Sequence, residues 1–544
     1  MKRNIIGWLL LGAILVFLLF AFSFCGTKNQ STNDDDAAIT DDDTQNSDDD
    51  ADDDTMKFPD GFLFGAATSG FQVEMGCPTL SPELCNDPNS DWYQFVTSPV
   101  TVNDPLAFVS GDDPAKVGPG EWELYEHDFD LAADNSGHNA FRLGIEWSRI
   151  FPTSTVGIEG YENLRAVANQ AAVDHYHQVF AALRERGLKP LVTLNHYTLP
   201  VWIHDGVGCH QDFRHCSPRG WVDKDTTVRE IAKYAGFVAH EFGGEVDLWT
   251  TLNEPMAVMM AGYVLPSPQR SNPPALFLHF KEFKIVMAAM IEAHARMVDA
   301  IRANDTVDAD GDGVAAQVGV VYAMSPAAPK DPASKLDREA AANLFYLWNM
   351  VFLNATALGQ FDANIDGHPV YRADLAGRMD FIGLNYYTRI VVSGLPFSID
   401  PWFSPLLTFN PLTMNFNDVY PRGIYEMTSL IKERFGLPVY ITENNARSDP
   451  QDNAVEEMKS LVEHLSWLWY AIEQGVDVRG YFYWALIDNF EWNQGPKPYG
   501  LYAVDVNNPD KPRTAREIVA LYREITQAHG IPPDLAAQYP VDFH

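Results

Sequence analysis

Eight short apolar runs, separated by longer segments of helical periodicity, constrain the fold of this 544-residue chain more than any other feature. A short apolar run that ends in polar residues is typical of a buried parallel strand. We predict eight such strands, at residues 62–67, 140–145, 190–195, 248–252, 318–322, 381–384, 439–442 and 480–484. The helical patterns between them include residues 173–186, 226–242, 278–303, 337–358 and 455–474.

This eightfold alternation predicts an α/β fold, a single (β/α)8 barrel of the TIM type with elaborated loops. A doubly wound sheet fits less well, because no glycine-rich phosphate turn follows the first run. The longest loops are residues 76–121, 200–225 and 393–422, after the first, third and sixth runs. These loops leave the carboxyl ends of strands, where barrel enzymes bind their ligands, so we expect them to form walls around the site.

Two of the predicted strands end in a carboxylate. One reads Val-Tyr-Ile-Thr and continues into Glu443, and the other reads Leu-Trp-Thr-Thr-Leu-Asn and continues into Glu254. Either residue alone could be a strand-end glutamate in a salt bridge. Cleavage of a glycosidic bond requires two catalytic carboxyl groups, and two carboxylates on one rim therefore favour that chemistry.

The charge of the chain limits its partners. The net charge is −36, and 12 aspartates lie within the first 55 residues. Such a surface repels phosphate backbones, so we expect no nucleic-acid binding. It also disfavours anionic substrates, unless a local basic site overrides it.

The N-terminal segment predicts export and a membrane tether. Lys2 and Arg3 precede an uncharged apolar run over residues 5–24, and Cys25 follows directly. Residues 1–25 resemble a bacterial lipoprotein signal with Cys25 as the lipidated residue, although Phe24 departs from that pattern; an uncleaved signal anchor is the alternative. Residues 26–56 predict a disordered Asp-rich linker, and residues 57–544 the catalytic domain. The domain is then exposed on the periplasmic or extracellular face.

The other four cysteines form two close pairs, Cys77 with Cys85 and Cys209 with Cys216. In an oxidising compartment each pair predicts a disulfide. Metal binding is the alternative for the second pair, because His210 and His215 lie beside it. We favour the disulfides.

Residues 308–313 match the first half of an EF-hand calcium loop. The twelfth position is Gly319, which supplies no carboxylate, and a strand follows where an EF-hand has a helix. We interpret the segment as an acidic surface turn, with weak structural calcium as the alternative.

Seven motifs occur in order along the chain, each near a predicted strand: FPDGFLFGAATSGFQVEMG, FRLGIEWSRIFP, LNHYTLP, TLNEP, DFIGLNYY, ITENN and GYFYWALIDNFEW. Together they resemble glycoside hydrolase family 1, the retaining β-glucosidase-like enzymes, from residue 58 to about residue 522. The resemblance implies an exo-acting β-glycosidase for β-glycosides or oligosaccharides, with no metal and no organic cofactor. It leaves the oligomeric state open.

The resemblance also implies catalytic roles. Glu443 matches the nucleophile and Glu254 the acid–base, with the two carboxyl groups about 5 Å apart. Arg142 and Tyr387 match residues that contact the nucleophile, and Asn253 matches the contact to the sugar 2-hydroxyl. We therefore expect a raised pKa for the acid and a low pKa for the nucleophile.

Further matches imply a pocket for the terminal sugar. The matched residues are Gln72, His196, Tyr197, Asn385, Trp484, Glu491 and Trp492. The chain departs from the family at Tyr197-Thr198, which replaces Trp-Asp; at Asn445, which replaces Gly; and at residues 495–500, which reshape one end of the pocket.

Two alternatives stay open. Lys497 and Tyr499 resemble part of the phosphate clamp of the 6-phospho-β-glycosidases, but Glu491 would repel a 6-phosphate and suits a free 4- or 6-hydroxyl. A non-catalytic sugar-binding relative is the second alternative. Such relatives typically lose one of the two glutamates, and this chain has both.

Overall fold

The computed structural model describes residues 55–445 and 453–544. The predicted signal or anchor segment, Cys25 and all but the last two residues of the predicted linker lie outside the described residues. Among the residues that the structure describes, no helix is both long enough and apolar enough to cross a membrane.

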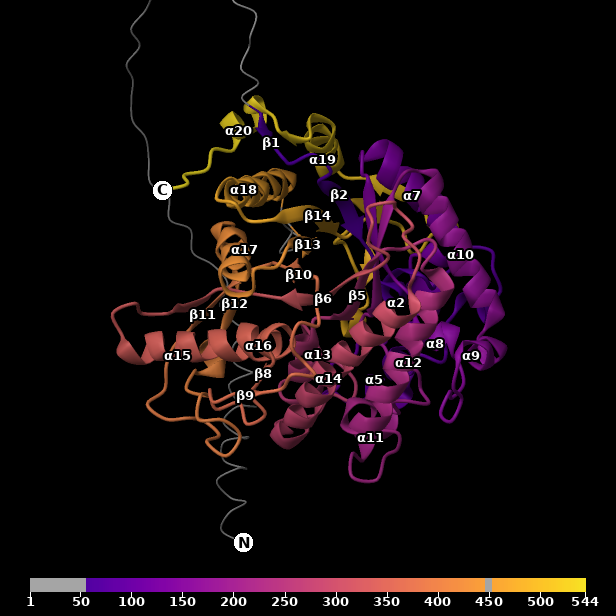
Figure 1. The fold of residues 1–544 in the computed structure, drawn as a ribbon, viewed down its shortest axis with the longest axis horizontal. Coiled ribbons are helices and arrows are strands. Elements are labelled where there is room, and N and C mark those ends of the chain that lie inside the picture. Colours follow the sequence, from indigo (N-terminus) through magenta and orange to yellow (C-terminus); the bar gives the residue numbers. More distant parts are fainter. Residues whose placement is uncertain (1–54, 446–452) are drawn as a thin grey trace, which may run out of the picture. The chain divides into compact units, whose positions relative to one another are not determined.

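Eight parallel strands close into a barrel, and this confirms the predicted fold (Figure 1). Around the ring they follow the order β10-β13-β14-β2-β3-β4-β5-β6, so each strand pairs with its sequence neighbour among the eight. Their bounds lie within two residues of the predicted ones. They are β2 (Leu63–Ala67), β3 (Ala140–Gly144), β4 (Lys189–Asn195), β5 (Leu248–Asn253), β6 (Gln317–Ala323), β10 (Phe381–Asn385), β13 (Val439–Asn444) and β14 (Val478–Trp484).

Amphipathic helices surround the barrel (Figure 1). In α12 (Lys224–Phe242) the buried residues Ile231, Tyr234, Ala235 and Val238 recur at helical spacing, so one face packs inward. The other principal helices are α10 (Gln170–Glu185), α13 (Pro255–Tyr263), α14 (Phe280–Asn304), α17 (Arg422–Phe435), α18 (Ala454–Glu473) and α19 (Glu517–Ala528).

The helix predicted at residues 337–358 is interrupted. It consists of α15 (Lys335–Phe345), a π-helical turn η3 (Tyr346–Met350) and α16 (Val351–Leu358). Asn349 lies in the π turn, where its amide accepts from the Ser325 N–H at 3.0 Å and donates to the Ser325 carbonyl at 2.9 Å. These two bonds satisfy the backbone just after β6, and a π turn commonly marks such a local adjustment.

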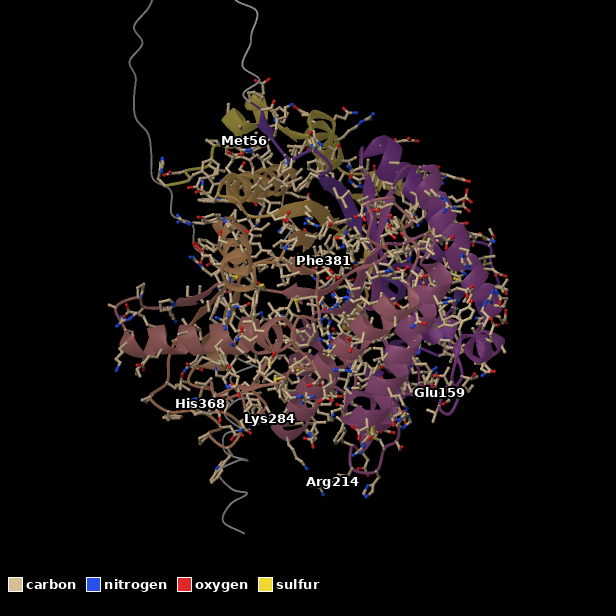
Figure 2. The ribbon with its side chains drawn as sticks, in the orientation of Figure 1. Met56, Glu159, Arg214, Lys284, His368 and Phe381 are labelled. Atoms are coloured by element: carbon tan, nitrogen blue, oxygen red, sulfur yellow. A yellow bond between two sulfur atoms is a disulfide. The ribbon has the colours of Figure 1, made fainter. Side chains whose placement is uncertain are left out.

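Side chains fill the barrel interior. Phe381 lies near the middle of the molecule (Figure 2), with its ring centroid 4.9 Å from that of Tyr440. Gly319 provides the space for Phe381, because a Cβ atom at Gly319 would lie 2.5 Å from that ring. The barrel is therefore a packed core and not a pore, and active sites of such barrels lie at the carboxyl ends of the strands.

The long loops after the first and third strands contain short helices and both predicted disulfides. The loop after β2 contains α2 (Gly70–Val73), α3 (Pro82–Cys85), α4 (Asp91–Thr97), α5 (Pro99–Val102), α6 (Pro114–Val117) and α7 (Glu121–Asp130), followed by the π-helical η1 (Leu131–Asn135). Cys77 is bonded to Cys85, and Cys209 in α11 (Gly206–Gln211) is bonded to Cys216. Because Cys209 and Cys216 are bonded to each other, the metal-binding alternative for this pair is wrong.

The loop after β10 is more regular than predicted. Its strands β11 (Arg389–Val392) and β12 (Asn415–Asp418) join β7 (Ala327–Pro329) in a small mixed sheet. The acidic segment at residues 308–313 is an exposed turn before β6, in which Asp308 accepts from the backbone N–H groups of Gly311 and Gly313. Carboxylate oxygens of Asp247, Asp308 and Asp310 approach one another within 4.8 Å.

Candidate active site

The carboxyl ends of two barrel strands, β5 and β13, carry the predicted catalytic residues. Glu443 belongs to β13 and is buried, with 4% of its surface exposed. Glu254 follows β5 directly and precedes α13, whose first residue is Pro255. Strands β6 and β10 lie between β5 and β13 in the ring, and Asn385 of β10 is in register with Glu443.

Two donors hold the carboxylate of Glu443. Arg142, which is fully buried on β3, donates from Nη1 to Oε1 at 2.6 Å, and the Tyr387 hydroxyl donates to Oε2 at 2.5 Å. The guanidinium is itself fixed, because its Nε donates to Thr193 Oγ1 at 3.1 Å. A cation on one oxygen and a phenol on the other stabilise the ionised form of this carboxylate.

Glu254 has different partners. The Asn385 amide donates to Oε1 at 2.8 Å, and the Tyr197 hydroxyl donates to Oε2. The backbone of Glu254 is left-handed, with φ 45° and ψ 60°. A non-glycine residue costs free energy in this conformation, and such residues concentrate at functional sites.

Hydrogen bonds connect the two glutamates through Asn253. Its side-chain oxygen accepts from Arg142 Nη2 at 2.8 Å and from Asn385 Nδ2 at 3.3 Å. Because Arg142 also holds Glu443 and Asn385 also holds Glu254, a continuous chain of hydrogen bonds joins the carboxylates. This network fixes their relative position before any ligand binds.

The pKa of Glu443 differs from the expectation drawn from the sequence. Burial raises it to about 7, Arg142 and Tyr387 act in the opposite direction, and the nearby Glu254 raises it further. The expectation of a low pKa for this residue was therefore wrong. The sequence motifs predict the cation and the phenol beside Glu443, but they do not predict its burial. Burial raises the pKa by more than Arg142 and Tyr387 lower it.

His196 is neutral, because burial and the nearby Arg142 and Arg270 hold its pKa well below its usual range. Asn253 Nδ2 lies 2.9 Å from His196 Nε2, so the amide donates and the imidazole nitrogen accepts. The proton of the neutral ring is then on Nδ1. That nitrogen is buried and has no hydrogen-bond partner among residues 55–445 and 453–544.

Three predicted aromatic residues lie around His196. The ring centroids of Trp484 and Trp492 are each 5.8 Å from the imidazole, and that of Tyr197 is 5.1 Å from it. Tyr197 and Trp492 also contact each other at 4.7 Å, and both have positive φ, 74° and 51°. The peptide bond between Trp484 and Ala485 is cis.

Glu491 is buried between two donors. Gln72 in α2 donates from Nε2 to Oε2 at 2.8 Å, and Arg270 donates from Nη2 to Oε1 at 2.8 Å. Burial raises the pKa of Glu491, and Arg270 opposes that shift. Arg270 was not predicted, since a single arginine in a proline-rich loop carries no sequence signal for a site.

The structure therefore connects the predicted site residues by direct contacts. Glu254, Glu443, Arg142, Asn253, Asn385, Tyr387, Tyr197 and His196 form one hydrogen-bonded and aromatic group, which Trp484 and Trp492 adjoin; Trp492 in turn stacks on Phe71, beside Gln72 in α2. Lys497 lies on β16 (Pro496–Lys497), which pairs with β15 (Asn489–Phe490) just before Glu491.

A closed (β/α)8 barrel whose carboxyl-end rim carries two glutamates, joined by a hydrogen-bond network, defines the class of glycoside-cleaving barrel enzymes. Comparison with known proteins agrees. The family model of glycosyl hydrolase family 1 matches residues 54–531. The chain belongs to this family and is an O-glycosyl hydrolase.

Curated relatives carry β-glycosidase names. The chain is 37% identical to a β-galactosidase of Pyrococcus woesei, over 87% of this chain and 98% of the relative. It is 28% identical to β-glucosidase A of Thermotoga maritima, over 87% of this chain and 99% of the relative. Among solved structures, the β-glycosidase of Thermosphaera aggregans superimposes with a TM-score of 0.75 at 30% identity, covering 89% of this chain and all of that one.

Proposed function

We propose that the protein is a retaining, exo-acting β-glycosidase that hydrolyses terminal non-reducing β-D-glycosyl residues, with β-glucosides as its principal substrates. The observation that carries the proposal is the asymmetry of the two linked glutamates. Glu443 has a cation and a phenol as partners, whereas Glu254 has an amide and a phenol. This difference suits a nucleophile and an acid–base, respectively.

In the first step, the carboxylate of Glu443 attacks the anomeric carbon while Glu254 donates its proton to the glycosidic oxygen. The bond to the aglycone breaks, and a glycosyl ester of Glu443 forms. Arg142 and Tyr387 hold the attacking carboxylate in one orientation, which reduces the entropic cost of reaching the transition state. Glu254 becomes ionised, and Asn385 and Tyr197 stabilise its charge.

In the second step, Glu254 removes a proton from water, and the resulting hydroxyl attacks the same anomeric carbon. The ester to Glu443 breaks, and the carboxylate returns to Arg142 and Tyr387. Two displacements at one carbon give a product with the configuration of the substrate.

Binding of the terminal sugar is the second part of the proposal. The carboxylate of Glu491, the amide of Gln72 and Nδ1–H of His196 are buried polar groups suited to ring hydroxyls, and Trp484 and Trp492 supply flat apolar faces. The names of the relatives, β-galactosidase and β-glucosidase, support substrates of this class.

A 6-phospho-β-glycosidase of the same fold is the competing assignment. Lys497 supports it, but the buried carboxylate of Glu491 would lie close to a sugar phosphate and repel it. Comparing kcat/KM for 4-nitrophenyl β-glucoside and its 6-phosphate decides between the two. A preference for the phosphorylated substrate would overturn the proposal.

The central test measures hydrolysis of 4-nitrophenyl β-glucoside, β-galactoside, β-fucoside and β-mannoside by the full-length protein. Glu443→Ala should abolish turnover, whereas Glu339→Ala, at an exposed position on α15, should not change it. Proton NMR of the first-formed sugar should show the β anomer. An α anomer, or full activity in Glu443→Ala, would contradict the mechanism, and an inactive wild-type protein would favour a non-catalytic sugar-binding role.

We also propose that the enzyme is exported and tethered to the membrane through residues 1–25. The two disulfides support an oxidising compartment. Fractionation of expressing bacterial cells tests this proposal: activity should follow the membrane fraction and should be accessible from the periplasm or the cell surface. If Cys25→Ser releases the protein from the membrane, the tether is a lipid; if it does not, the tether is a signal anchor.

A further inference from the structure

Arg270 reaches the site from a loop that the family motifs do not include. The loop lies between α13 and α14, and Asn493 fixes it on both sides of Arg270. The Asn493 side chain accepts from the Ser271 N–H at 3.0 Å and donates to the Pro268 carbonyl at 3.2 Å. The backbone that carries Arg270 is therefore held in place next to Trp492.

The guanidinium group of Arg270 lies among three site residues. Its Nη2 donates to Glu491 at 2.8 Å, and its central carbon is 5.7 Å from the ring centroid of Tyr197 and 5.9 Å from that of Trp492. Tyr197 in turn donates to Glu254. The cation thus stands between the proposed acid–base and the carboxylate proposed to bind the sugar.

One donor of this guanidinium is left over. Nη1 is buried and has no hydrogen-bond partner among the described residues, although 31% of the side chain is exposed. A buried charged donor without a partner is costly, so its presence calls for a functional explanation. Other buried donors without a partner among the described residues include Nδ1 of His196, which belongs to the same aromatic group, and the side chains of Ser271 and Asn272, the next two residues of the loop.

Glu491 and Arg270 together present an acceptor and a donor side by side. A hydroxyl group can donate to the carboxylate and accept from Nη1–H at the same time, so it satisfies both. A methyl group or a hydrogen atom satisfies neither. A phosphate or carboxylate would accept from Arg270 but would be repelled by Glu491.

We propose that Arg270 is a specificity-determining residue, which selects glycones that carry a free hydroxyl at C4 or C6 by donating from Nη1 to that oxygen. This inference rests on the proposed function and names a residue through which the site distinguishes sugars. The competing explanation is purely structural: Arg270 neutralises Glu491 and contacts no substrate.

The experiment crosses variants with substrates. We would measure kcat/KM for 4-nitrophenyl β-D-glucoside and for its 4-deoxy and 6-deoxy analogues, with the full-length wild-type protein, Arg270→Lys and Arg270→Gln. Lysine keeps a cation beside Glu491 but lacks the second arm of the guanidinium fork. Arg372→Gln is the matched control, because Arg372 is also part-exposed, pairs with Asp374 at 2.7 Å and lies 5.7 Å from the Phe361 ring.

The readout is the ratio of kcat/KM between the glucoside and each deoxy analogue. In both Arg270 variants we expect the ratio for one of the two analogues to fall by about 10- to 100-fold, because a charge-assisted hydrogen bond to the glucoside is lost. In Arg372→Gln we expect no change in either ratio. Thermal unfolding shows which variants are folded, and the lysine variant carries the test if glutamine destabilises the protein. Ratios that stay within about twofold of wild type for both analogues would overturn the inference, even if absolute rates fall.

The experiment distinguishes a failure of the inference about Arg270 from a failure of the proposed function. If the wild-type protein hydrolyses the glucoside and the ratios do not change, only the role of Arg270 fails. If the wild-type protein hydrolyses no aryl β-glycoside, the proposed function fails first.

Discussion

Asn385 donates a hydrogen bond from Nδ2 to Oε1 of Glu254 at 2.8 Å, while its own side-chain oxygen accepts from Thr442 Oγ1 at 2.8 Å. Thr442 is the residue before Glu443. A single amide on β10 thus sets the position of one glutamate and is itself oriented by the strand that carries the other. The mechanism proposed above depends on this coupling.

Asn385→Ala should lower kcat/KM about 10- to 100-fold, because Glu254 loses a donor that stabilises its charge once it has given up its proton. Steady-state kinetics on 4-nitrophenyl β-glucoside measures the effect. Asn354→Ala is the control, since Asn354 is also buried but bonds Arg434 outside the site. Equal losses of activity in the two variants would mean that the effect is one of folding.

Tyr387→Phe should change the pH dependence of the reaction. Glu443 must be ionised to attack, and its pKa is already raised to about 7. Because the Tyr387 hydroxyl lowers that pKa, its removal raises it further, and the acidic limb of kcat/KM shifts to higher pH. The loss should be about tenfold below pH 6 and smaller at pH 8.

The control for Tyr387→Phe is Tyr386→Phe, since the neighbouring hydroxyl donates to the Tyr420 carbonyl instead. A loss of the same size at every pH in Tyr387→Phe would contradict the assignment of the limb to Glu443.

Tyr197→Phe should affect acid catalysis. Burial and the Glu254 charge hold the pKa of the Tyr197 hydroxyl well above its usual range, so it stays protonated and donates to Glu254. Alkyl β-glucosides need protonation of the leaving group, whereas 4-nitrophenyl glucosides need little. We expect about a tenfold loss on the alkyl substrate and a smaller one on the aryl substrate. Tyr234→Phe, which removes a buried bond to the Ile145 carbonyl, should affect both substrates equally.

Glu146→Gln should change how stability depends on pH. Burial raises the pKa of Glu146 from 4.5 to about 8, and Glu74 adds to the shift. Between these values the folded state binds more protons than the unfolded state, so this group lowers the free energy of unfolding as pH rises from 5 to 8. The glutamine variant should gain about 2–4 kcal/mol relative to wild type across that interval, measured by urea unfolding. A difference that does not vary with pH would show that Glu146 is ionised in the folded protein.

Removing the Cys209–Cys216 disulfide by substituting both residues with serine should cost about 2 kcal/mol of stability, because it closes only a short loop. His210, inside that loop, bonds the Pro274 carbonyl at 2.9 Å on the loop that carries Arg270. We therefore expect a higher KM as well. If the serine variant is as stable as the oxidised wild-type protein, the disulfide has no stabilising role.

The strand-tip residues could be predicted from the sequence because the barrel itself determines where they lie. Glu443 and Asn385 come from the ends of paired strands, so naming the strands places both on one rim. Arg270 could not be found in this way. Its position depends on Asn493, more than 200 residues further along the chain, which bonds the backbone on both sides of it.

Two other differences have physical causes that a motif does not contain. The raised pKa of Glu443 comes from loss of solvent, which depends on every element packed around the residue. The helix predicted at residues 337–358 is broken at a π turn, where Asn349 bonds Ser325 in the link between β6 and β7. Local periodicity describes neither effect.

The left-handed backbone at Glu254, Tyr197 and Trp492 also limits how this enzyme can evolve. A replacement at these positions must tolerate a conformation that costs most side chains about 1–2 kcal/mol, and β-branched residues more. Arg270 is not among the positive-φ residues. New substrate preferences should therefore arise more readily by changes at Arg270 and its loop than by exchange of the aromatic residues around the catalytic pair.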